Sequence, residues 1–296
     1  MKHAVLIVAH TQLDLLIELI GKFDNNFSFF IHVDKKVCLP HSFIESLLSI
    51  NNVKYVGQQY KVNWGGRSIV DAILWLCHIA LTNKEGACCD YFHLISGSDF
   101  PIKNCETIKS FFEKKSGQNF LDFFRLPNAR WFGNGIDRLM FFHPMDRINW
   151  QNPLASKIYE RYINCQRSKF LFRPLPGHPI YGGSTWWSLT HEAVTYICEH
   201  ANDNGWYDRL KDTFAPDEMF VQTILLNSYL KGTLVNNNLR YVDWNVRDGN
   251  SPVLLDERDA SAIRQSPAIF ARKLDPNISR RLIEILNAQY PHPLEK

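Results

Sequence analysis

AVLIVAH, at residues 4–10, is the stretch that decides the fold. Six apolar residues follow one another without a polar interruption, and the run then stops at His10. A short apolar run without alternation is typical of a strand buried on both faces, as in a parallel sheet. Further strands are predicted at 27–33, 53–56, 91–95 and 119–123.

Amphipathic stretches separate these strands. Helices are predicted at 12–21, 41–49, 67–81 and 105–115. Alternation of strands and helices implies a mostly parallel sheet with helices on both faces. The chain is irregular from 124 to 180, apart from a helix near 154–166. Beyond it we expect strands at 185–189 and 239–242, an apolar stretch at 267–271, and helices at 190–203, 216–229 and 277–288.

The fold class is therefore α/β. Neither an internal repeat nor a low-complexity linker divides the sequence, so one domain over 1–296 is the simplest interpretation. Ligands of such sheets bind beyond the carboxyl ends of the strands. Polar residues follow three of the apolar runs, at His10, at 32–35 and at 96–99. We expect them to form a polar site at one edge of the sheet.

Composition and charge argue against several classes of protein. A net charge of +3 without a basic arm argues against a nucleic-acid binder. The seven cysteines are irregularly spaced and include no Cys-x-x-Cys, which disfavours a metal centre or a disulfide framework. Neither a secretory signal nor an apolar run long enough to span a bilayer is present. We expect a cytoplasmic protein, and peripheral association with the inner membrane surface stays open.

Motifs for common cofactors are absent. Gly133-Asn134-Gly135 lacks the third glycine of a dinucleotide fingerprint and follows no clear strand, and no Walker sequence occurs. The chain also has no Asp-x-Asp pair, with which nucleotide-sugar transferases often hold a cation. We expect neither a metal nor an organic cofactor.

Ala215-Pro216-Asp217-Glu218 has two interpretations. Proline followed by acids is typical of a helix start, since it suits the proline angle and the positive helix end. A carboxylate at the mouth of a site can also act as a general base toward a sugar hydroxyl. The local sequence alone favours the helix start.

Basic residues adjoin two short apolar runs of the C-terminal third. Arg240 precedes Tyr241 and Val242, and Arg272 and Lys273 come after 267–271. Single Arg and Lys residues are usually solvated, but placed at the sheet edge they can neutralise a leaving diphosphate. Nearby, Trp186 and Trp187 are adjacent on a predicted strand and would face opposite sides. One packs in the core, and whether the other offers its ring to a sugar is left open.

Several segments together resemble one family, the core 2 / I-branching β-1,6-N-acetylglucosaminyltransferases and the peptide O-xylosyltransferases (glycosyltransferase family 14). They occur in the family's order and cover nearly the whole chain. The matching segments are 4–10, IHVDKK (31–36), 62–67, YFHLISGSDFPIK (91–103), GSTWWSL (183–189), PDEMFVQTILLN (216–227) and FARK (270–273).

This resemblance implies a GT-A-like fold, a UDP-sugar donor, inversion at the anomeric carbon and no metal requirement. Glu218 matches the family's catalytic base, and Lys273 matches a basic residue at the donor diphosphate. We accordingly expect donor contacts from Val8, His10, Asp34, Arg240, Arg272 and Lys273, and substrate contacts from Asp99, Trp186, Trp187 and Asp217.

The expected function is transfer of a sugar, N-acetylglucosamine or xylose, to a glycan or lipid-linked glycan in bacterial surface polysaccharide synthesis. Residues 1–123 would form the nucleotide-binding half and 124–296 the acceptor and catalytic half. A non-catalytic carbohydrate-binding protein and a glycoside hydrolase stay open as alternatives. A hydrolase typically needs two carboxylates that flank the bond, and Asp217 is a poor second acid beside Glu218.

Overall fold

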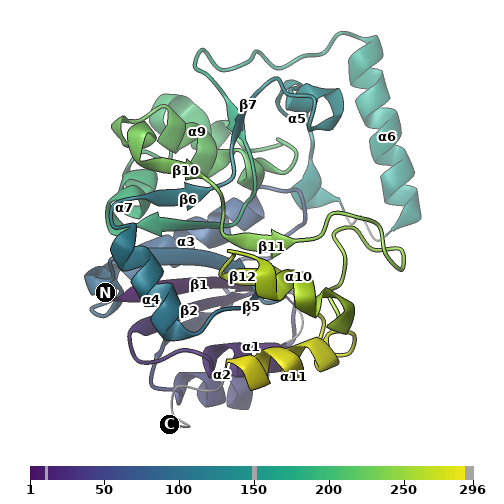
Figure 1. Ribbon diagram of the computed structural model, residues 1–296. Coiled ribbons are helices and arrows are strands. Elements are labelled where there is room, and N and C mark those ends of the chain that lie inside the picture. Colours follow the sequence, from purple (N-terminus) through teal and green to yellow (C-terminus); the bar gives the residue numbers. More distant parts are fainter. Residues whose placement is uncertain (11–12, 149–151, 291–296) are drawn as a thin grey trace.

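The computed structural model describes residues 1–10, 13–148 and 152–290 (Figure 1). A central sheet of seven strands runs through this part of the chain. In spatial order the strands are β10 (Leu234–Asn236), β6 (Asn119–Leu121), β9 (Trp187–Thr190), β4 (Tyr91–Ser96), β1 (His3–Ala9), β2 (Phe27–Val33) and β3 (Val53–Gly57). Among them β9 alone runs antiparallel to its neighbours, so the predicted mostly parallel sheet is confirmed.

Strand β1 is buried along its whole length because both faces of the sheet are covered. Val5 and Ile7 belong to one hydrophobic cluster, whereas Ala4 and Leu6 belong to the cluster on the opposite face. The first cluster is covered by α1 (Leu13–Ile20), α2 (His41–Leu48), α4 (Cys105–Lys114), α10 (Ala260–Gln265) and α11 (Arg280–Gln289). The second is covered by α3 (Ser68–Thr82), α7 (His191–Glu199), α8 (Trp206–Arg209) and α9 (Phe220–Leu226).

The carboxyl ends of β1, β2 and β4 meet at one edge of the sheet. Val8 of β1 lies opposite His32 of β2 and Ser96 of β4. Two backbone hydrogen bonds continue the alignment beyond the strands, from Asp34 N–H to the Ala9 carbonyl (2.8 Å) and from Gly97 N–H to the Val8 carbonyl (3.2 Å). The polar residues that follow the three strands therefore share an edge, as the sequence predicts.

A second, three-stranded sheet stands beside that edge. It contains β5 (Phe100–Pro101), β12 (Phe270–Arg272) and β11 (Arg240–Val242), with β12 in the middle. Leu274 N–H donates to the Ser98 carbonyl at 2.9 Å, which fastens the end of β12 to the turn after β4. The predicted strand at 239–242 thus corresponds to β11, and the apolar stretch at 267–271 leads into β12.

The predicted helix at 216–229 is wrong in its extent. Residues Pro216–Glu218 form a single 3₁₀ turn, and the helix α9 begins only at Phe220. Ala215 takes a left-handed conformation (φ 46°), and Met219 departs from helical angles (φ −129°), so the turn and the helix are separate. Asp217 and Glu218 consequently sit on a turn that precedes α9.

The irregular stretch contains the predicted helix, α6 (Pro153–Ser168). Its first turn is capped by the Asn152 side chain, which accepts from Leu154 N–H at 2.9 Å. The same stretch adds a short α5 (Asp137–Met140) and the strand β7 (Phe124–Arg125), which pairs with β8 (Tyr181–Gly182) just after the stretch. Position 12, the predicted start of the first helix, lies outside the described residues. Within the residues that are described, no helix combines the length and apolarity needed to cross a membrane.

Arg240 is part of this framework, contrary to the prediction that it faces a ligand. Its guanidinium is buried and donates to the carbonyls of Leu94 (2.7 Å) and Trp187 (2.8 Å), to Ser188 Oγ (2.9 Å) and to the Asn238 carbonyl. These acceptors occupy both terminal nitrogens, so Arg240 links β11 to β4 and β9. The structure therefore gives Arg240 a structural role in place of the expected donor contact.

Replacing Arg240 by Leu should destabilise the protein by about 2–4 kcal/mol, because the buried carbonyls lose their donors. Urea unfolding measures the change. The matched control is Arg264→Leu at an exposed position of α10, which should stay within about 0.5 kcal/mol of the parent. Unchanged stability with weakened UDP binding would return Arg240 to the donor site.

Candidate active site

Glu218 offers an accessible carboxylate at the end of its 3₁₀ turn. One third (33%) of its side chain is exposed. The turn is held from both sides, since Ala215 N–H donates to the Gly65 carbonyl and Gly183 N–H donates to the Glu218 carbonyl, each at 2.8 Å. A carboxylate on a fixed backbone that still reaches solvent can exchange a proton with a bound hydroxyl.

Arg138 orients this carboxylate, and sequence reasoning missed it. Its Nη1 donates to Glu218 Oε2 at 2.6 Å, and the guanidinium lies 3.6 Å from the centre of the Trp131 ring. Arg138 comes from α5, a four-residue helix inside the irregular stretch. The richness of that stretch in Arg and Trp was the only signal, because Arg138 belongs to no motif.

Asp217 faces another way. Its Oδ2 accepts from Thr185 Oγ1 at 2.5 Å. Burial and, secondly, the charge of Glu218 raise the pKa of Asp217 to about 7. The two adjacent carboxylates thus have different partners, so they do not form the facing pair that a glycoside hydrolase requires.

Asp99 and Arg272 form a buried ion pair next to the turn after β4. Asp99 is fully buried, and its Oδ2 accepts from the Ser96 backbone N–H (2.7 Å) and from the Ser96 hydroxyl. Its Oδ1 lies 3.6 Å from Arg272 Nε, and neither atom has a hydrogen-bond partner in the described ranges. Burial lowers the pKa of Arg272, and the charges of Asp99 and Glu218 oppose this shift.

Of the two tryptophans, the structure brings Trp186 to the site and leaves Trp187 in the core. The Arg272 guanidinium lies 4.5 Å from the centre of the Trp186 ring, which packs just ahead of β9. Trp187 is the first residue of β9, pairs with Leu94 and Leu121, and is almost completely buried. The expected substrate contact from Trp187 is therefore corrected to a core role.

His10 follows β1 and Asp34 follows β2, and the hydrogen bond from Leu274 N–H to the Ser98 carbonyl brings Lys273 to the same edge of the sheet. Burial lowers the pKa of His10, Asp34 opposes this shift, and Lys273 and Lys36 reinforce it. Burial and the neighbouring Arg272 lower the pKa of the half-buried Lys273. Two lysines and one carboxylate therefore influence the ionisation of His10.

Asp34 and Val8 contribute mainly to the shape of this edge. Asp34 Oδ1 accepts backbone N–H groups from Lys36 (2.9 Å) and Val62 (3.2 Å), and Lys36 Nζ lies 3.4 Å from Oδ2. Val8 is buried, so a ligand would meet its backbone rather than its side chain. The edge predicted from the strand ends is thus shaped by backbone groups that Asp34 holds in place.

A cavity of about 330 Å³ opens beside Arg138, between α5 and α6. Phe132, Tyr159 and Phe214 provide aromatic surface, and Asp137 and Arg167 provide an ion pair of 2.8 Å. Flat rings combined with charged hydrogen-bonding groups suit a sugar, which has both apolar faces and hydroxyls. Through Arg138 this cavity lies next to Glu218.

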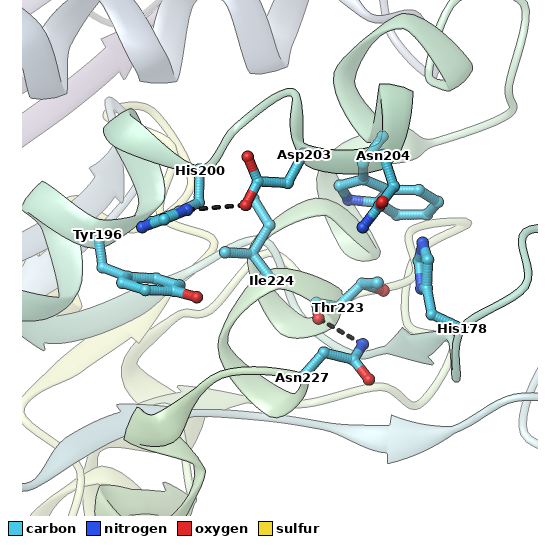
Figure 2. A pocket seen from close by; sticks show the side chains of 9 residues that line it. His178, Tyr196, His200, Asp203, Asn204, Thr223, Ile224 and Asn227 are labelled. Carbon is cyan, nitrogen blue, oxygen red and sulfur yellow. Dashed lines mark hydrogen bonds and ion pairs between the residues drawn. The ribbon is translucent and has the colours of Figure 1, made fainter.

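A second cavity, of about 310 Å³, lies apart from these residues between α7 and α9 (Figure 2). The His200–Asp203 pair (2.7 Å) and Asn227, which donates to the Thr223 carbonyl (2.8 Å), border it. None of the predicted site residues lines it. Within the described ranges, no cluster of three His, Cys, Asp or Glu residues is arranged to hold a metal ion.

The family model named Core-2/I-Branching enzyme matches residues 4–264. Xylosyltransferase 2 of Homo sapiens and of Pan troglodytes are each 29% identical to the chain over 280 residues, or 88% of this chain and 30% of the relative. The chain thus spans about 30% of the length of these relatives. A crystal structure of apo mouse xyloside xylosyltransferase 1 aligns with 94% of this chain and 98% of that one at 10% identity, but its TM-score of 0.39 is too low to support an inference.

The pKa of Asp217 predicts a pH dependence. With a folded pKa of about 7, Asp217 keeps a proton that the unfolded chain releases near its ordinary value of 3.8. Its contribution to stability is present below that value and is lost as the pH rises through about 7. Urea unfolding between about pH 5 and about pH 8 should show the parent losing stability more steeply than Asp217→Asn. Equal slopes for the two proteins would contradict this account.

Proposed function

The chain belongs to the Core-2/I-Branching enzyme family, and on this basis we propose that it transfers a sugar from a UDP-sugar to a hydroxyl group of a glycan. One observation carries the proposal: the turn that bears the accessible carboxylate of Glu218 lies beside the cations of Arg272 and Lys273. Arg272 contacts the Trp186 ring at 4.5 Å, and the preceding residue, Thr185, donates to Asp217 of that turn. The hydrogen bond from Leu274 N–H to the Ser98 carbonyl holds the two cations at the carboxyl edge of the sheet. A base and a diphosphate site are the two groups that a single displacement from a nucleotide sugar requires.

On the donor side, UDP lies along the carboxyl ends of β1 and β4. Lys273 and Arg272 face its diphosphate and neutralise the charge that develops as the bond to the anomeric carbon breaks. Asp99 positions Arg272 through their ion pair, in which Oδ1 of Asp99 lies 3.6 Å from Nε of Arg272. In this proposal the two basic side chains supply the positive charge, so transfer needs no metal ion.

On the acceptor side, Glu218 removes the proton of the attacking hydroxyl. The acceptor oxygen forms its bond to the anomeric carbon from the face opposite the leaving UDP, which inverts the configuration. The proton ends on Glu218, and Arg138 keeps the carboxylate aligned at 2.6 Å. General-base assistance of this kind contributes about 10²–10⁴-fold to a rate.

The acceptor binds in the cavity between α5 and α6. Its aromatic residues stack on sugar rings. In its ion pair, Asp137 accepts hydrogen bonds from sugar hydroxyls and Arg167 donates to them. We propose N-acetylglucosamine or xylose as the transferred sugar and a surface glycan, free or linked to lipid, as the acceptor. The role in bacterial surface polysaccharide synthesis belongs to the same proposal.

Glu218→Gln should lower transfer more than about 100-fold, because the amide cannot take the proton. UDP affinity should stay near that of the parent. Turnover is measured as UDP release, with Glu257→Gln at an exposed position as the matched control. Residual activity above a few per cent would remove Glu218 from the role of base.

Lys273→Ala should weaken UDP binding about tenfold or more, because a partly buried cation at the diphosphate is lost. Isothermal calorimetry in the presence of EDTA measures this affinity without a contribution from metal ions. Lys84→Ala, at an exposed position far along the chain, should leave the affinity unchanged. An unaltered affinity in Lys273→Ala would exclude its contact with the diphosphate.

A further inference from the structure

Helix α6 turns an apolar stripe outward. Its inner side buries Ile163 and Gln166 against the body of the protein. On the outer side Leu154 is 65% exposed, Ile158 is 59% exposed, and Tyr162 continues the row. Residues four apart lie on one face of a helix, so these three form a continuous stripe. Figure 1 shows α6 at the margin of the molecule, set apart from the central sheet.

The loop after α6 adds further exposed apolar side chains, and hydrogen bonds hold it to the body of the protein. Phe170 is 78% exposed, and Leu171, Phe172 and Leu175 are also exposed. Arg173, by contrast, is buried and donates to the carbonyls of Arg209, Lys211 and Asp212. Because these hydrogen bonds fix the backbone of the loop, the neighbouring apolar side chains are held in exposed positions.

The same segment concentrates positive charge. Residues 147–175 contain six basic residues and one acid, Glu160. Because the whole chain carries only +3, the remainder of the molecule is slightly acidic. Lys157, Arg161 and Lys169 are exposed beside the stripe and form no ion pair within the described residues. Basic side chains next to exposed leucine, isoleucine and phenylalanine are the signature of a helix that lies in a lipid interface.

We propose that the outer face of α6 and the loop after it dock on an anionic lipid bilayer. We call this surface the α6 face; it consists of Leu154, Lys157, Ile158, Arg161, Tyr162, Lys169, Phe170 and Leu171. The apolar side chains enter the interface, and the basic ones bind the headgroups. A second copy of the chain fits less well, because a two-fold contact would bring Lys157 and Arg161 of both copies together. A nucleic acid would leave the aliphatic stripe without a partner.

This orientation has a consequence for the site. Tyr159 and Ile163, on the inner side of α6, line the cavity next to Arg138. Docking of the outer face therefore brings that cavity to the level of the headgroups, where the sugar of a lipid-linked molecule lies. The docking itself does not depend on the proposed transfer reaction, and it is tested without measuring activity.

Co-sedimentation of the full chain with vesicles tests the proposal. Binding should occur to phosphatidylcholine vesicles that contain phosphatidylglycerol, should be weak without it, and should fall as salt is raised. The double variants Leu154→Ser/Ile158→Ser and Lys157→Glu/Arg161→Glu should each lower the partition coefficient about tenfold or more. Matched controls are Leu48→Ser/Ile278→Ser and Lys84→Glu/Lys231→Glu, at exposed positions elsewhere, which should bind as the parent does.

Circular dichroism confirms that each variant is folded before vesicles are added. Absence of binding to the anionic vesicles would overturn the proposal, as would variants of the α6 face that bind like the parent. Light scattering measures whether the protein forms a dimer instead. A dimer that the α6 variants abolish, together with no affinity for vesicles, would assign the face to a second copy and refute the membrane interface.

Discussion

The buried ion pair between Asp99 and Arg272 is the contact on which the site depends. Asp99 follows β4, is closed off from solvent, and has one oxygen satisfied by Ser96 and the other facing Arg272 at 3.6 Å. A buried carboxylate is costly unless a cation or hydrogen-bond donors compensate it. Arg272 therefore has to remain at the end of β12, and the residue after it, Lys273, is held at the carboxyl edge of the main sheet.

The turn at residues 216–218 separates two adjacent carboxylates, Asp217 and Glu218. Two adjacent carboxylates repel each other, and the 3₁₀ turn directs Asp217 toward Thr185 and Glu218 toward Arg138. Burial together with the charge of Glu218 raises the pKa of Asp217 to about 7, so near neutral pH Asp217 carries only part of a negative charge. This arrangement leaves Glu218 as the accessible carboxylate, next to a cavity that can receive a hydroxyl-bearing ligand.

Much of this architecture can be predicted from the sequence because it depends on local patterns. The apolar runs of β1, β2 and β4 identify buried strands, and the polar residues after them identify the shared edge. What could not be predicted is where a side chain points when its partners lie far along the chain. Arg240 adjoins a short apolar run as Arg272 does, yet it donates to the carbonyls of Leu94 and Trp187, more than fifty residues away.

The same limit explains why Arg138 could not be predicted: it belongs to no motif and acquires its role only when α5 folds against the turn at 216–218.

Whether these residues form a glycosyltransferase site is most directly decided by incubating the protein with a panel of UDP-sugars, without acceptor, and following the products by NMR. The account predicts slow release of UDP from one sugar donor, with the freed sugar appearing first in the inverted anomeric configuration. Release from none of the donors, or first appearance of the retained anomer, would contradict it.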